Sequence, residues 1–105
     1  MAKRPDIRMT HTTLRVLRYF FETPREEFSG ADIINATSVG SGSLYPILYR
    51  LQDAGWLTAR WEEIDPSEAG RPRRRFYKLT NNGYAWAQEE LNKRGMMSGA
   101  AQWAV

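Results

Sequence analysis

The chain has 105 residues, 42% of them apolar, no cysteine, and a net charge of +3 with an isoelectric point near 9.5. This length predicts one small domain, and the lack of cysteine excludes disulfides and thiolate metal sites. Because the sequence contains neither a signal-peptide-like apolar run nor an apolar segment of membrane-spanning length, we expect a cytoplasmic protein, and its basic character indicates a polyanionic partner.

The first part of the chain is polar and basic, and we expect positions 1–11 to form a flexible arm. A first helix is predicted from Thr12 or Thr13 to Glu22, because apolar residues recur there at helical spacing and a proline follows. A second, short helix is predicted over 30–36, where an upstream Ser-x-x-Asp sequence has the spacing of a capping box. A polar, glycine-bearing turn then leads into a third helix, which is the order of a helix-turn-helix motif.

The third predicted helix begins at Gly42 or Ser43 and ends at Gly55. Leucines and an isoleucine fall on one stripe of it, which predicts a buried face. Pro46 is expected in the first turn, where its missing N–H is tolerated, with Ser43 or Ser41 as the N-cap. The other face suits the phosphate-lined groove of duplex DNA, and its candidate DNA-binding residues are Ser41, Ser43, Tyr45, Pro46, Tyr49 and Arg50.

Beyond Gly55 the apolar period changes from 3.6 to 2, which predicts the two strands of a hairpin. On the first strand Trp61 shares the phase of Leu57, so we expect both side chains in the core. The connection between the strands is rich in proline and glycine and should project as a wing. Its end is dense in arginines that we expect to contact phosphates or the minor groove, namely Arg71, Arg73, Arg74 and Arg75.

A last helix is predicted over 81–94 after the N-cap Thr80, followed by a tail, 95–105, without a clear period. On this helix a possible dimer surface consists of Tyr84, Trp86 and Leu91. The order of helix, helix, helix, hairpin and helix predicts a mainly α-helical α+β domain over 12–94, the winged helix-turn-helix.

Two segments resemble the PadR-like transcriptional regulators, namely GSGSLYPILYRLQDAGWL at 40–57 and GRPRRRFYKLTNNG at 70–83. The resemblance implies a bacterial or phage homodimer, usually a repressor, with its third helix in the major groove and its wing on or near the minor groove. The chain departs from many relatives at 30–33, where it has Gly-Ala-Asp-Ile in place of Gly-Tyr-Glu-Ile. It also lacks the late aromatics that hold planar ligands in drug-responsive relatives, so the sequence assigns no effector.

Simpler structural explanations remain open for these residues. The arginines are also typical of a solvated edge strand, one of the tyrosines would then pack under the wing, and Arg50 would pair with Asp53. A winged helix that serves as a protein-interaction module without specific DNA binding is the alternative function. The sequence has one histidine, no nucleophile paired with it and no phosphate-binding loop, so we expect no enzyme, metal site or cofactor.

Overall fold

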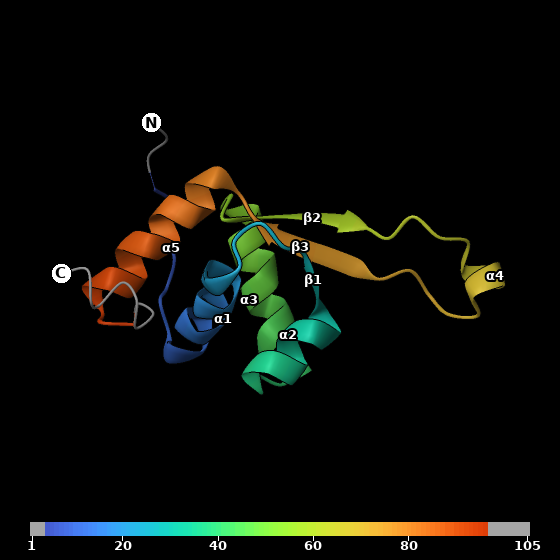
Figure 1. Ribbon diagram of the computed structural model, residues 1–105. Coiled ribbons are helices and arrows are strands. Elements are labelled where there is room, and N and C mark those ends of the chain that lie inside the picture. The colour runs from blue at the N-terminus through green and yellow to red at the C-terminus, as the bar shows by residue number, and fades with distance from the viewer. Residues whose placement is uncertain (1–3, 97–105) are drawn as a thin grey trace.

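The computed structural model describes residues 4–96 as a body of helices from which a two-stranded wing extends (Figure 1). Its elements in chain order are α1 (His11–Glu22), β1 (Phe28–Ser29), α2 (Gly30–Thr37), α3 (Ser41–Asp53), β2 (Leu57–Trp61), α4 (Pro66–Ala69), β3 (Arg75–Leu79) and α5 (Asn81–Lys93). This is the expected winged helix-turn-helix. Most of the predicted tail, 95–105, and the first three positions lie outside the described residues. None of the described helices has the length and apolar character needed to span a membrane.

Side-chain caps determine where the first two helices begin. The Oγ1 of Thr10 accepts the N–H of Thr13 at 3.1 Å, so α1 begins slightly before the predicted Thr12 or Thr13. The predicted capping box of α2 is confirmed, since the Ser29 N–H donates to Asp32 Oδ2 at 3.0 Å and the Asp32 N–H donates to Ser29 Oγ at 3.1 Å. These reciprocal bonds satisfy two backbone donors at the start of a helix of only eight residues.

Helix α3 begins earlier than the sequence predicted. Its N-cap is Gly40, whose carbonyl oxygen accepts the N–H groups of Ser43 at 3.1 Å and Leu44 at 2.9 Å. Ser43 therefore lies within the first turn, and neither it nor Ser41 is the N-cap. Pro46 consequently lies in the helix interior, where its missing N–H leaves the Gly42 carbonyl without the usual donor from the next turn.

The sheet has three strands in the order β1-β3-β2, and both pairings are antiparallel. Strand β1 was not predicted, because a strand of two residues has no period to recognise. Phe28 pairs with Tyr77, and Ser29 pairs with Phe76. Since Ser29 also caps α2, this short strand fixes the start of α2 against the base of the wing.

The prediction that Trp61 belongs to the core is wrong. Leu57 is only 2% exposed, whereas Trp61, on the same face of β2, is 57% exposed. Trp61 pairs with Arg75 at the last rung of the β2–β3 ladder, where the ribbon has already left the helical body. The connection beyond it contains the short helix α4, which is capped by Asp65 at the tip of the wing.

The predicted dimer surface on α5 also differs from the structure. Trp86 is 7% exposed and its ring lies 5.4 Å from that of Trp56, while Leu91 is fully buried. Both side chains therefore belong to the interior of a single chain, because α1 and the turn after α3 cover the face of α5 that we assigned to a partner. Tyr84 is the exposed member of the predicted set, and its ring stacks on Phe21 of α1 at 4.9 Å.

The described part of the predicted flexible arm lies against the helical body. Ile7 and Met9 pack on the core, and Arg4 pairs with the carboxylate of Glu90 at 2.6 Å. Burial raises the pKa of Glu90, but a hydrogen bond from Arg94 and the nearby cations outweigh it, so the pKa lies below its ordinary value. The segment before α1 is thus held to α5 by a buried carboxylate.

The turn between α3 and β2 is bonded to the start of α5. Gly55 has φ of +84°, and this left-handed conformation lets the Trp56 N–H donate to the Leu51 carbonyl at 2.8 Å. Thr80 Oγ1 donates to the Gly55 carbonyl at 2.7 Å and accepts the N–H of Gly83 at 2.8 Å. The Leu-Thr-x-x-Gly sequence therefore joins the end of α3, both strands of the wing and α5.

Gly83→Ala is expected to destabilise this junction. A Cβ at position 83 would overlap the carbonyl oxygen of Trp56, which is backbone and cannot rotate away. We expect the free energy of unfolding to fall by about 2 kcal/mol or more, as measured by urea denaturation. Gly42→Ala is the matched control, because a Cβ there has open space within a helix and should leave stability equal or slightly higher. Equal stability of Gly83→Ala and the unsubstituted protein would contradict the junction.

Candidate nucleic-acid interface

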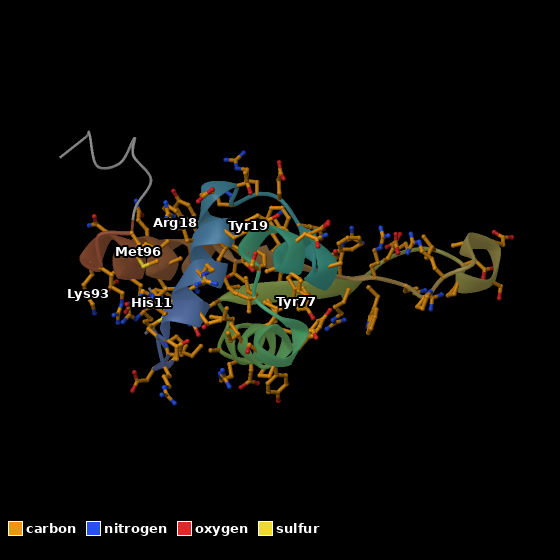
Figure 2. The ribbon with its side chains drawn as sticks, turned by 90° about the horizontal axis from the view of Figure 1, so that it is seen from below. His11, Arg18, Tyr19, Tyr77, Lys93 and Met96 are labelled. Atoms are coloured by element: carbon orange, nitrogen blue, oxygen red, sulfur yellow. The ribbon has the colours of Figure 1, made fainter. Side chains whose placement is uncertain are left out.

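The two faces of α3 divide as the sequence predicted. The apolar residues Leu44, Ile47, Leu48 and Leu51 are each at most 4% exposed and pack in the core. All six candidate DNA-binding positions of this helix are exposed, namely Ser41, Ser43, Tyr45, Pro46, Tyr49 and Arg50. Figure 2 shows α3 at the edge of the body, with side chains projecting outward from it. The helix thus presents a continuous polar and aromatic face to solvent.

The tyrosines of this face have different surroundings. Tyr45 is 46% exposed, and its ring lies against Gly30 at the start of α2, so it packs on α2 while keeping an accessible edge. Tyr49 is 68% exposed and extends into solvent. Arg50 is exposed, and among residues 4–96 no ion pair joins it to Asp53, so the alternative pairing does not form. Tyr49 and Arg50 are therefore both available to a ligand.

The first arginine of the wing is paired within the wing. Arg71 donates two hydrogen bonds to the carboxylate of Glu62, at 2.7 and 2.9 Å. The same carboxylate accepts the backbone N–H of Arg74 at 3.1 Å. The bonds from Arg71 and, to a lesser extent, Arg74 lower the pKa of Glu62 from 4.5 to about 2. Arg71 therefore has less charge to offer a polyanion than the sequence suggested, and it instead joins the segment after β2 to the segment before β3.

The next three arginines lie toward the body and face a groove. Arg73 donates from Nε to the Ile64 carbonyl at 3.0 Å, and the guanidinium of Arg75 lies 4.9 Å from the ring centre of Trp61. The groove has a volume of 540 Å³. Its lining comes from the start of α2, from α3 and from the wing, and consists of Ser29, Gly30, Ala31, Tyr45, Trp61, Arg73, Arg74, Arg75 and Tyr77.

The groove brings together candidates that are about thirty positions apart in the sequence. Tyr77 is 8% exposed, and Figure 2 labels it near the meeting point of α2, α3 and the sheet. It separates the groove from the core, so that Tyr45 and the wing arginines share one surface. Sequence reasoning missed Trp61 as part of this surface. Trp61 lies opposite Arg75 in the hairpin. A charged residue at that position, on the side of the strand expected to face the core, indicates that this end of the hairpin is outside the core.

The opposite face of the wing has a similar arrangement with a different charge balance. Arg60 lies over the ring of Phe76 at 5.1 Å, as Arg75 does over Trp61. However, Arg60 also forms a two-bond pair with Glu27, at 2.7 and 2.8 Å, which neutralises it. Among the described residues no carboxylate pairs with Arg75. Among the described residues, the arginine–aromatic pair on the groove side therefore keeps its positive charge, whereas the pair on the far side does not.

A family comparison agrees with this geometry. The model of the family described as "Transcriptional regulator PadR-like family" matches residues 30–89, which is more than half of the chain. The chain belongs to the PadR-like family of transcriptional regulators. The family consists of transcriptional regulators, not enzymes. The match begins at Gly30, against which Tyr45 packs, and runs through the wing into α5.

Solved structures share the fold of this PadR-like regulator. A PadR-like transcription factor from Bacteroides fragilis has 23% identity and a TM-score of 0.65, and the match covers 90% of this chain and 92% of that one. AbfR of Staphylococcus epidermidis, in a disulfide form, has 20% identity and a TM-score of 0.67, with coverage of 91% and 65%. NadR in complex with 4-hydroxyphenylacetate has 28% identity and a TM-score of 0.63, with coverage of 81% and 54%.

The present chain thus spans less than two thirds of the AbfR and NadR chains. A further structure contains reduced AbfR bound to DNA, with 23% identity and a TM-score of 0.62. No curated protein matches the chain by sequence.

Gly30→Ala is expected to weaken binding to specific DNA without unfolding the PadR-like domain. A Cβ at this position would overlap the outer ring atoms of Tyr45, and this flexible side chain moves more easily than backbone. We expect a loss of affinity similar to that of Tyr45→Ala, measured by fluorescence anisotropy. The double substitution should lose no more than either single one, because both act on the same ring. Additive losses would show that Gly30 acts by another route.

The Glu62–Arg71 pair predicts a pH dependence of stability. The pKa of Glu62 falls on folding from 4.5 to about 2, so its stabilisation is complete above pH 4.5 and is lost as the pH falls toward 2. Glu62→Gln should therefore lose less stability than the unsubstituted protein over this range, measured by denaturation at several pH values. Glu63→Gln, which removes the same charge from an exposed neighbour, is the control. Identical pH profiles for Glu62→Gln and the unsubstituted protein would contradict the pairing.

Proposed function

We propose that this PadR-like regulator is a cytoplasmic repressor that binds an inverted repeat in duplex DNA as a homodimer. The observation that carries the proposal is the shared groove, in which Tyr45 of α3 and the wing residues Arg73, Arg74 and Arg75 line one surface. A helix and a basic ribbon that face the same side suit the major groove and the neighbouring phosphates of one duplex.

Helix α3 is the proposed reader of sequence. Its first turn is exposed and contains Ser41, Gly42 and Ser43, so the backbone has only small side chains between it and a phosphate. The unpaired guanidinium of Arg50 has the geometry to donate two hydrogen bonds to a guanine edge. Tyr49, on the same exposed face, offers a ring to thymine methyl groups or a hydroxyl to a phosphate.

The wing is the proposed source of affinity that is independent of sequence. Arg73, Arg74 and Arg75 lie near its base, whereas Asp65 and Glu68 are exposed at its tip. Phosphates attract the base and repel the tip, so we propose that the base of the wing contacts the DNA. Arg71, paired with Glu62, contributes less than its place in the arginine run suggests.

We infer a homodimer because one chain offers only a small surface for contact with base pairs. A single recognition helix covers a few base pairs, and two copies related by a two-fold axis cover two half-sites about one helical turn apart. Tyr84, exposed on α5 and stacked on Phe21 of α1, remains the candidate for the dimer contact. Bound across an operator, such a dimer would exclude the polymerase.

Selection of duplexes from a random library, repeated at two salt concentrations, tests this proposal. The expected result is an enriched inverted repeat whose affinity falls steeply with salt, together with a dimer in sedimentation. Lack of enrichment with weak retention even at low salt would refute specific DNA binding, and it would favour a protein-interaction module. Enrichment of a single half-site by a monomer would refute the dimer alone.

Replacing Arg73, Arg74 and Arg75 with alanine should weaken binding to specific and random duplexes alike. Each phosphate contact contributes about 0.9 to the slope of log affinity against log salt, so the triple variant should show a slope smaller by about 2 to 3. Arg60→Ala is the matched control, because this arginine lies on the far side of the same ribbon and is paired with Glu27. An unchanged slope in the triple variant would remove the wing from the interface.

A further inference from the structure

The most exposed tryptophan of the described residues lies in an unusual place. Trp61 is 57% exposed, although burial of an indole normally stabilises a small domain. It occupies the last rung of the β2–β3 ladder, beyond the helical body, and it lines the groove with Tyr45 and the wing arginines. The fold itself obtains little from this side chain, because the core is completed by Trp56 and Trp86.

The pair formed by Trp61 and Arg75 differs from its counterpart on the other side of the ribbon. Both Arg75 over Trp61 and Arg60 over Phe76 join directly opposite residues of β2 and β3. On the far side Arg60 is neutralised by Glu27, and Phe76 is partly buried. On the groove side the aromatic ring is exposed and no carboxylate of the described residues pairs with the arginine. Of these two pairs, only the one on the groove side therefore combines an exposed aromatic ring with an arginine that no described carboxylate neutralises.

We propose that Trp61 contacts the DNA directly, with its indole packed against deoxyribose carbons and base edges between the α3 contacts and the wing contacts. This inference rests on the proposed function. Sugars and thymine methyl groups are the apolar surfaces that a duplex offers at its grooves, and an indole buries more of them than any other side chain. The guanidinium of Arg75, which lies 4.9 Å from the ring centre, reaches the phosphate next to that sugar independently of the indole.

Trp61→Ala tests whether Trp61 contacts the DNA itself or only positions Arg75. If the indole packs on DNA, its removal should lower affinity about tenfold or more while the salt slope stays unchanged, because no phosphate contact is lost. Trp61→Phe should recover much of the affinity, since it keeps an aromatic surface. Phe76→Ala, which truncates the matching aromatic on the far side, should leave affinity within about twofold. Thermal unfolding of each variant confirms that the wing remains folded.

Hydroxyl-radical footprinting gives a second readout that does not depend on affinity. At saturating protein, Trp61→Ala should lose protection at the sugars between the α3 footprint and the wing footprint, while Trp61→Phe keeps it.

Three results would contradict the proposed contact, each in a different way. A loss of affinity with a slope smaller by about 0.9 would mean that Trp61 only positions Arg75, and it would overturn the proposed contact. Unchanged affinity and footprint in Trp61→Ala would overturn it as well, while leaving the proposed function intact. Failure of the unsubstituted protein to bind any duplex would refute the proposed function, and this contact with it.

Discussion

The hydrogen bonds of Thr80 at the turn after α3 are the interaction on which the other parts depend. The Thr80 side chain donates to Gly55 and accepts from Gly83, and its N–H donates to the Trp56 carbonyl at 3.1 Å. The turn between α3 and β2, the end of β3 and the start of α5 are thereby joined at one residue. A displacement there would rotate α3 relative to the wing, which would separate the two halves of the proposed DNA surface.

A second connection fixes the groove from its other end. Ser29 is at once the last residue of β1 and the cap of α2, and Gly30, the next residue, supports the ring of Tyr45. The position of Tyr45 on α3 is therefore set by a strand that pairs with the wing. Tyr77, which is 8% exposed, forms the floor of the groove between Tyr45 and the wing arginines.

Ion pairs determine which of the fifteen basic residues are available to contact a polyanion. Glu62 pairs with Arg71, Glu27 pairs with Arg60, and Glu90 pairs with Arg4 of the segment before α1. These pairs lie on the outer part of the wing, on its far face, and on α5, away from the groove. The modest net charge of +3 therefore understates the local field at the groove, where Arg73, Arg74 and Arg75 lie together.

The sequence by itself determined the local elements. The leucine stripe and polar face of α3, the capping box of α2 and the cap Thr80 each depend on neighbours within about four positions, and all three are confirmed. The two motifs that resemble the PadR-like family also identified the fold, and the family comparison confirms it.

Only the tertiary structure decided how far the core extends. An alternating period shows which face Trp61 occupies, but not that β2 leaves the body before reaching it. A helical period likewise places Trp86 on a face of α5 without revealing that Trp56 covers that face. Strand β1 and the docking of Arg4 on Glu90 depend on partners about fifty and eighty-six positions away. Such contacts depend on the packing of whole elements, which no short stretch of sequence encodes.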